Sequence, residues 1–254
     1  MAIAITPKQL QILILLYRFR FLNRYHIQTI LNHKDPKRIN TWLKDLTNLK
    51  LIGRIYSTKL LENTKPAIYY LLPRSKGVMG HIEGVASSLF SRLYGDKSRS
   101  RRFIDHQLLL ASFYLHLTKS NQGKVHFYTK TDLFHHPYLI QPLPDAYIAL
   151  KKGKTTKRHF LEIIDEGTPR FVLRKRIEMY IEYYDTGEWT QATQYPFPKV
   201  LLLCPDEKVK KFLHRHISRV VEEEMDADLI KWFLATKDNL SWINALAETQ
   251  EQED

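Results

Sequence analysis

DPKRINTWLKDLTNLKLIGRIY, residues 35–56, is the stretch that decides the fold of the first part of the chain. Asp35-Pro36 is a strong helix start, because aspartate caps the free N–H groups of a first turn and proline fits the first helical position. Apolar residues then recur at helical spacing: Ile39, Trp42, Leu43, Leu46 and Leu49. The pattern predicts an amphipathic helix from Pro36 to Leu49, followed after Gly53 by an extended run at residues 54–56.

Two shorter helices and a second extended run surround this stretch. Thr6-Pro7 is another cap-and-proline start, and Asn23 is a candidate N-cap for a helix over residues 24–31. Residues 67–72 form the second extended run, and the polar residues 63–66 suit a hairpin tip. Helix, helix, helix, hairpin is the order of a winged helix-turn-helix, in which the third helix enters the DNA major groove.

The winged-helix interpretation makes specific residues candidates for DNA contact. The runs 43–54 and 69–77 resemble the segments that lead into and out of the wing in winged-helix regulators. Arg pairs with guanine and Asn with adenine, whereas Lys and Thr commonly hold phosphates. The third helix, the wing and a later basic stretch supply such side chains: Lys37, Arg38, Asn40, Thr41 and Lys44; Arg54, Lys59 and Lys65; and Arg99, Arg101 and Arg102.

The distribution of charge also favours DNA binding by the first part of the chain. Residues 1–102 carry 19 Lys and Arg against 5 Asp and Glu, a net charge of +14, whereas residues 103–254 carry 20 against 22, a net charge of −2. A positive field confined to one segment is typical of a surface that binds a polyanion. We therefore expect double-stranded DNA as the partner. Because helix-turn-helix proteins usually dimerise, we also expect a homodimer on a pseudopalindromic site.

Length and composition indicate two folded domains. The chain has 254 residues, 44% of them hydrophobic, which suits packed cores. The one cysteine, Cys204, excludes an internal disulfide framework. No apolar run reaches the ~18 residues of a membrane helix, so we expect a cytoplasmic protein with no membrane partner. The expected layout is a winged helix-turn-helix domain over 1–94, a basic linker over 95–102, a second domain over 103–245 and an acidic tail over 246–254.

The second domain is predicted to be a mixed sheet flanked by helices. Helical periodicity marks residues 104–117, 171–184 and 207–221, and extended runs lie at 125–129, 143–151, 157–164, 200–204 and 230–235. The chain is thus expected to be a two-domain protein of α+β and α/β class.

This order resembles the PD-(D/E)XK nuclease-like fold, with Asp145 on the second strand and Glu162 on the third. In active members an Asp and a Glu hold Mg²⁺, and a Lys two residues after the Glu positions the attacking water. Here the Lys position is Ile164, and a shifted register brings Asp165 into the site but leaves the motif incomplete. A cation could come instead from the next helix, which carries Arg170, Arg174, Lys175 and Arg176.

Three interpretations of these carboxylates stay open. They are ordinary turn and loop residues, or a degenerate metal site, or the centre of a working nuclease. In the last case Asp145 and Glu162 are Mg²⁺ ligands, Asp165 assists, and Lys175 or Arg174 is the substitute cation.

Across most of its length the chain resembles the replication-relaxation family of bacterial plasmids and integrative elements. The resemblance includes the winged helix and Leu143-Pro144-Asp145-Ala146 on a strand. It also includes FLEIIDEGT at 160–168, similar to the family's LEIDRGT, and YPFPKVL at 195–201, similar to its FP.VL. This chain has one residue more than the family pattern between Glu162 and Asp165. The resemblance implies a DNA-binding role in replication, mobilisation or control of the element's genes.

Three functional hypotheses follow. The first is a DNA-binding protein of a plasmid or mobile genetic element with a degenerate nuclease-like domain. The second is a Mg²⁺-dependent DNA endonuclease or nickase. The third is an adaptor that recruits a replication or conjugation protein. Only the second requires a cofactor, Mg²⁺.

Overall fold

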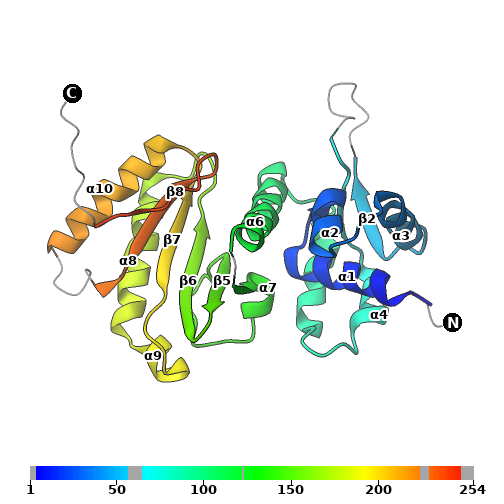
Figure 1. Cartoon of the computed structure of the whole chain (residues 1–254), viewed down its shortest axis with the longest axis horizontal. Helices are drawn as coiled ribbons and strands as arrows, with labels where there is room; N and C mark the ends of the chain where they lie inside the picture. Colours follow the sequence, from blue (N-terminus) through cyan, green and yellow to red (C-terminus); the bar gives the residue numbers. More distant parts are fainter. Residues whose placement is uncertain (1–3, 57–64, 122, 224–228, 247–254) are drawn as a thin grey trace. The chain divides into compact units, whose positions relative to one another are not determined.

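The chain folds into two compact units, Met1–Ser120 and Asn121–Asp254. A computed structural model describes residues 4–56, 65–121, 123–223 and 229–246 (Figure 1). Lys59, residues 63–64 of the predicted hairpin tip and residues 247–254 of the predicted acidic tail lie outside the described residues. In the described part of the chain, no helix has the length and apolar character needed to cross a membrane.

Helices and a three-stranded antiparallel sheet form the first unit. Its elements are α1 (Pro7–Phe19), β1 (Leu22–Asn23), α2 (Arg24–Ile30), α3 (Pro36–Asn48), β2 (Ile52–Ile55), β3 (Ile68–Leu71), the 3-10 turn η1 (Pro73–Ser75), α4 (Lys76–Met79), the 3-10 turn η2 (Ser87–Arg92), α5 (Leu93–Asp96) and α6 (Arg101–Ser120). The strand order is β1-β3-β2, with Gly53 opposite Tyr70. A Cβ atom at Gly53 would lie 2.3 Å from the Tyr70 ring, so any larger residue here would force this buried ring to move. The predicted order of three helices and a hairpin is observed.

Each predicted N-cap starts its helix as expected. Thr6 forms a capping box with Gln9, in which each side chain accepts a hydrogen bond from the backbone of the other residue. The side chains of Asn23 and Asp35 accept hydrogen bonds from backbone N–H groups in the first turns of α2 and α3. Local side-chain chemistry therefore sets all three helix starts.

The helix that was expected to open the second domain belongs to the first unit. In α6, Ile104 lies in a buried cluster with Phe21, Ile68 and Tyr70. Further along α6, the Ser112 hydroxyl is 3.0 Å from His26 Nε2, and burial lowers the pKa of His26 to about 4. These contacts correct the predicted division at residues 95–102, because the first unit continues through α6 to Ser120.

A buried ion pair explains why residues 95–102 are not a free linker. Asp96 ends α5, is only 1% exposed, and pairs with Arg20 just after α1. The Arg20 guanidinium also lies 4.5 Å from the centroid of the Phe103 ring, at the start of α6. Arg20 therefore connects the end of α1 to both α5 and α6.

We expect Asp96→Ala to lower the free energy of unfolding of the first unit by about 3 kcal/mol, because it leaves the Arg20 charge largely buried without its partner. Asp105→Ala is the matched control, since Asp105 is half exposed where it pairs with Arg101, and its loss should cost less than about 1 kcal/mol. Urea unfolding of the full chain measures both variants. Equal losses in the two variants would contradict the structural role of the buried pair.

A six-stranded mixed sheet with helices forms the second unit. Its elements are β4 (Lys124–Thr129), α7 (Lys130–Leu133), β5 (Ala146–Lys152), β6 (Thr155–Ile163), α8 (Arg170–Asp185), α9 (Glu188–Thr193), β7 (Lys199–Cys204), α10 (Glu207–Glu223), β8 (Trp232–Thr236) and β9 (Ile243–Asn244). The strand order follows the chain from β4 to β9, with β6, β7 and β8 parallel and the other pairs antiparallel. This confirms the predicted mixed sheet, but the short elements α7, α9 and β9 were not predicted.

The core of this unit lies between the sheet and two long helices. Figure 1 shows α8 and α10 beside the sheet. Leu173 and Ile177 of α8, and Leu213 and Ile217 of α10, share one buried cluster with alternate residues of the strands, such as Leu202. Residues at every second strand position face the same side, so this side of the sheet is the one the helices cover. The first residues of α8 and α10 follow the ends of the parallel strands β6 and β7.

Candidate functional site

The outer face of α3 presents the predicted DNA-contacting residues together. The inner face, with Ile39, Trp42, Leu43 and Leu46, is buried in the first unit. The five residues predicted to contact DNA are all exposed: Lys37, Arg38, Asn40, Thr41 and Lys44. Because residues three and four positions apart share a helix face, these side chains can reach one surface at the same time.

Two of these side chains also have contacts within the helix. The Arg38 guanidinium lies 5.9 Å from the centroid of the Trp42 ring, a distance that allows cation–π attraction. The Thr41 hydroxyl donates a hydrogen bond to the Lys37 carbonyl oxygen at 3.1 Å. Its oxygen lone pairs and methyl group stay available to an external group.

The base of the hairpin carries two more predicted residues. Arg54 is exposed on β2, and its guanidinium lies 5.5 Å from the centroid of the half-exposed Tyr56 ring. Lys65 is exposed where the chain returns toward β3.

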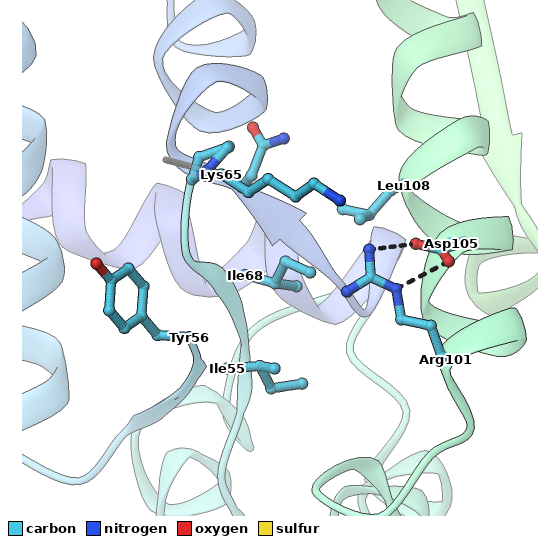
Figure 2. Close-up of a pocket in the computed structure, with 9 residues that line it drawn as sticks. Ile55, Tyr56, Lys65, Ile68, Arg101, Asp105 and Leu108 are labelled. Atoms are coloured by element: carbon cyan, nitrogen blue, oxygen red, sulfur yellow. Dashed lines mark hydrogen bonds and ion pairs between the residues drawn. The ribbon is translucent and has the colours of Figure 1, made fainter. Parts of the chain in front are cut away.

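A cavity of about 610 Å³ lies between the hairpin base and α6, both within the first unit. Figure 2 shows Ile55 and Ile68 beside it, with Lys65 and Arg101 reaching toward it. The cavity therefore combines an aliphatic wall with long cationic side chains.

The basic residues at the start of α6 and just before it make contacts within the first unit that the sequence did not indicate. Arg101 forms an ion pair with Asp105, with Nη2 2.8 Å from Oδ1 (Figure 2). The Arg99 guanidinium lies 5.2 Å from the centroid of the Phe103 ring, and its Nε atom is 3.7 Å from Asp96 Oδ1. Arg102 is exposed on the first turn of α6. All three predicted residues are thus in the first unit, and Arg99 and Arg101 lie close to carboxylates of the same unit.

In the second unit, Asp145 is a buried carboxylate at the entry to β5. It is 3% exposed, and its Oδ2 atom accepts a hydrogen bond from the backbone N–H of Ile163 at 2.6 Å. Its Oδ1 atom lies 2.7 Å from the ammonium nitrogen of Lys130 at the start of α7. Burial opposes the charged form of Lys130, but Asp145 and Glu162 outweigh this effect and raise the pKa of Lys130 above its usual value.

Glu162, near the end of β6, has its own cation. Its Oε1 atom accepts hydrogen bonds from Arg176 Nη2 at 2.6 Å and from the Tyr180 hydroxyl at 2.7 Å, both on α8. Burial works against the charge of Arg176, but Glu162 raises the pKa of this guanidinium further. Complete burial and the Glu162 charge raise the pKa of Tyr180 well above its usual range, so its hydroxyl remains a donor.

A cavity of about 300 Å³ lies beside these groups at the end of β6. Lys130, Glu162 and Arg176 form its polar part, and Asp165 and Lys175 also line it. Ile164 also lines the cavity, at the position where the nuclease motif has a lysine. The structure therefore brings the predicted Asp145, Glu162 and Asp165 to one region.

One of the two cations in this region, Arg176, lies on the helix that was predicted to supply one, whereas Lys130 does not. Lys130 lies against Asp145 and Arg176 against Glu162, whereas Lys175 is exposed on the cavity wall and Arg174 lies over the Phe212 ring, 5.6 Å from its centroid. Lys130 was missed because it follows a strand that was taken to end at Thr129. The capping box between Thr129 and Asp132 was the available signal, since it marks a helix start that places Lys130 in a first turn.

The two carboxylates do not fit a divalent metal in this arrangement. Mg²⁺ requires several oxygen ligands with near-octahedral geometry. Here both Asp145 oxygens and Glu162 Oε1 already have donors, and two of those donors carry positive charge. In the described ranges, no group of three or more His, Cys, Asp or Glu side chains could hold a metal ion. The carboxylates are therefore arranged as members of ion pairs.

Comparison with known proteins identifies the family. A family model described as Replication-relaxation matches residues 13–200. The chain belongs to the replication-relaxation family. The matched region begins within α1 and ends in β7, so it includes α3 and the Asp145 and Glu162 site. This confirms the resemblance seen in the sequence, and the family associates the protein with replication.

Similarity of this replication-relaxation protein to solved structures is low. One match is a mutant of Lactococcus lactis ZitR, with 22% identity and a TM-score of 0.27, covering 47% of this chain and 77% of that chain. Restriction endonuclease FokI matches with 14% identity and a TM-score of 0.34, covering 93% of this chain but 44% of that chain. FokI bound to DNA gives 13% identity and a TM-score of 0.31 with the same coverage. No match was found among curated proteins.

We expect Lys130→Met to lower the free energy of unfolding by about 2 kcal/mol, because it leaves the buried Asp145 carboxylate without its ammonium partner. The loss is below the ~3–5 kcal/mol of a fully buried pair because Lys130 is half exposed. Lys130→Met combined with Asp145→Asn should recover much of this loss, since asparagine still accepts from Ile163 and carries no charge.

Lys175→Met is the control for this experiment, because it removes an exposed cation from the same cavity. It should change stability by less than about 0.5 kcal/mol. Chemical unfolding of the four proteins measures the effects. A Lys130→Met variant as stable as the Lys175→Met variant would refute the structural role of Lys130.

Proposed function

We propose that this replication-relaxation protein is a sequence-specific DNA-binding protein of a plasmid or other mobile genetic element, acting in replication, mobilisation or transcriptional control. The observation that carries the proposal is the exposed face of α3, where Lys37, Arg38, Asn40, Thr41 and Lys44 stand together on a helix anchored by its buried face. In the proposed winged-helix domain α3 is the recognition helix and the hairpin β2–β3 is the wing.

The chemistry of this face suits both parts of DNA recognition. Arg38 can donate two hydrogen bonds to a guanine edge, and Asn40 can both donate to and accept from an adenine edge. Lys37, Lys44 and Thr41 are suited to phosphate oxygens, which fix the position of the helix without reading sequence. Arg54 and Lys65 extend the positive surface along the base of the wing.

The charge of the whole first unit supports the same ligand. Residues 1–120 carry 20 Lys and Arg against 6 Asp and Glu, a net charge of +14. A field of this size attracts DNA and makes binding strongly dependent on salt. Helix-turn-helix readers usually bind as dimers on symmetric half-sites. We therefore propose a homodimer bound to a pseudopalindromic duplex.

We propose that the second unit has a nuclease-like fold without cleavage activity. The pairing of Asp145 with Lys130 and of Glu162 with Arg176 supports this proposal, because it satisfies the carboxylates that active members of the fold use for Mg²⁺. A metal-dependent nickase is the second candidate. The observation in its favour is that Lys130, beside Asp145, supplies a cation to the cavity in which Ile164 replaces the lysine of the motif.

We expect Arg38→Ala to relax the preference for one base pair of the binding site by about 1–3 kcal/mol, because it removes the bidentate donor on α3. Arg74→Ala is the matched control, since it removes the same charge from an exposed position outside α3. The measurement is the affinity for a duplex selected from a random pool and for its single-base variants. Unchanged discrimination by Arg38→Ala would reject α3 as the reading helix.

We expect no nicking of supercoiled plasmid by the purified protein, with or without Mg²⁺ or Mn²⁺. Asp145→Asn is the companion variant, because asparagine can keep the hydrogen bond from Ile163 while the carboxylate charge is lost. Metal-dependent nicking that disappears in Asp145→Asn would establish the nickase instead. Nicking that persists in the variant would identify a contaminating nuclease.

A further inference from the structure

Five exposed cations of the second unit gather on neighbouring faces of two packed helices. They are Arg170 and Arg174 in the first turns of α8, and Lys208, Lys211 and Arg215 of α10. We call this set the α8–α10 basic face. Lys208, Lys211 and Arg215 are three and four residues apart, which places them on one side of α10.

The aromatic ring of Phe212 joins the two halves of this face. The guanidinium of Arg170 lies 4.9 Å and that of Arg174 lies 5.6 Å from the centroid of the Phe212 ring. Cation–π attraction at these distances restricts both arginine side chains and keeps their N–H groups near α10. The arginines are therefore partly preorganised beside the lysines, which lowers the entropy cost of binding an anion.

The positive charge of this face is not cancelled by ion pairs. Within the described part of the chain, none of its five members forms a salt bridge, while the neighbouring Lys210 pairs with Glu207 and Arg219 lies 3.8 Å from Glu223. Asp206 is engaged in capping α10 through the N–H of Val209. Two acidic residues lie near the face: Glu178, one turn beyond Arg174 on α8, and Glu207, which is paired with Lys210.

The net charge of the second unit gives no indication of this cluster of cations. Residues 121–254 carry 19 Lys and Arg against 21 Asp and Glu, a net charge of −2. A concentrated set of cations on a unit with no net positive charge produces a local field, and such a field favours an anion that spans several side chains.

The shape beside the face suits an extended ligand. A groove of about 480 Å³ runs along α10, lined by Lys211, His214, Arg215 and Ile243 together with the Glu207–Lys210 pair. Lys211 and Arg215 thus stand between this groove and Phe212. A chain of phosphates can contact successive cations along α10, whereas a single small anion would contact only one or two of them.

We infer that the α8–α10 basic face is a second DNA-binding surface, which holds the phosphate backbone of duplex DNA without reading its sequence. The inference rests on the proposed function, since it takes duplex DNA as the ligand of the protein. Backbone contacts add affinity and carry no sequence information directly. Two DNA-binding surfaces on one chain bind a DNA molecule more tightly than either surface alone when both can contact it at the same time.

The test is the salt dependence of duplex binding by the full-length protein, measured by fluorescence anisotropy with one selected duplex. Lys211→Glu combined with Arg215→Glu removes two phosphate contacts, so the slope of log K against log salt should decrease in magnitude by about 2. At the lowest salt the affinity should fall at least about 10-fold, because the reversed charges also repel phosphate. The loss should be equal for selected and unselected duplexes.

Lys152→Glu combined with Lys154→Glu is the matched control. These exposed residues lie at the turn between β5 and β6, so the variant has the same change in net charge at another place. It should keep the wild-type slope. Arg170→Gln combined with Arg174→Gln tests the other half of the face and should decrease the slope by a similar amount. This second variant decides the question if the α10 variant does not fold.

The outcomes separate the inference from the proposed function. If the wild-type protein binds no duplex, the proposed function fails. If it binds with sequence preference, and the α8 and α10 variants keep the slope of the Lys152 and Lys154 control, only the second surface is refuted. A decreased slope in both face variants, with unchanged base preference, supports the inference.

Discussion

The candidate site of the second unit depends on the contacts made by one buried residue, Asp145. Its backbone N–H donates to the Leu161 carbonyl, its Oδ2 atom accepts from the Ile163 N–H, and its Oδ1 atom binds the Lys130 ammonium. One residue thus fixes the start of β5 against the end of β6 and holds the first turn of α7 beside them. Because the group is almost completely buried, its charge has to be matched inside the protein, and Lys130 supplies that match.

The same contacts limit the chemistry of the site. A carboxylate oxygen that accepts a short hydrogen bond from a backbone N–H is already oriented toward β6, and its partner oxygen is bound by an ammonium group. Glu162 is held in a similar way by Arg176 and Tyr180. For a divalent ion to take these ligands, two cations would have to leave or share them, at the cost of leaving charges poorly compensated. The structural role and a metal-binding role therefore compete for the same oxygen atoms.

Sequence patterns predicted the features that depend on near neighbours. The N-caps at Thr6, Asn23 and Asp35, the stripe on α3 and most long strands followed from spacing of three or four residues or from alternation. The boundary of the first unit did not, because residues 95–102 look like a charged linker until Asp96 meets Arg20, 76 positions away. For Lys130, the local capping box at Thr129 and Asp132 marks a helix start but not the partner of the lysine. Its meaning comes from a contact with Asp145 that no local pattern encodes, so the fold of each unit was easier to predict than the partners within its site.

The positive charge of the first unit can be seen along the sequence, whereas that of the second unit is gathered on one surface only by folding. In the first unit the positive charge is visible in the sequence, since a whole segment is basic. In the second unit the sum over residues is slightly negative, yet helical spacing collects Lys208, Lys211 and Arg215 on one side of α10 and packing brings Arg170 and Arg174 beside them. An anion responds to the charges within about a Debye length, about 8 Å at physiological salt, and not to the net charge of the unit. The net charge of the second unit is therefore a poor guide to anion binding, and the local placement of these five side chains is the relevant quantity.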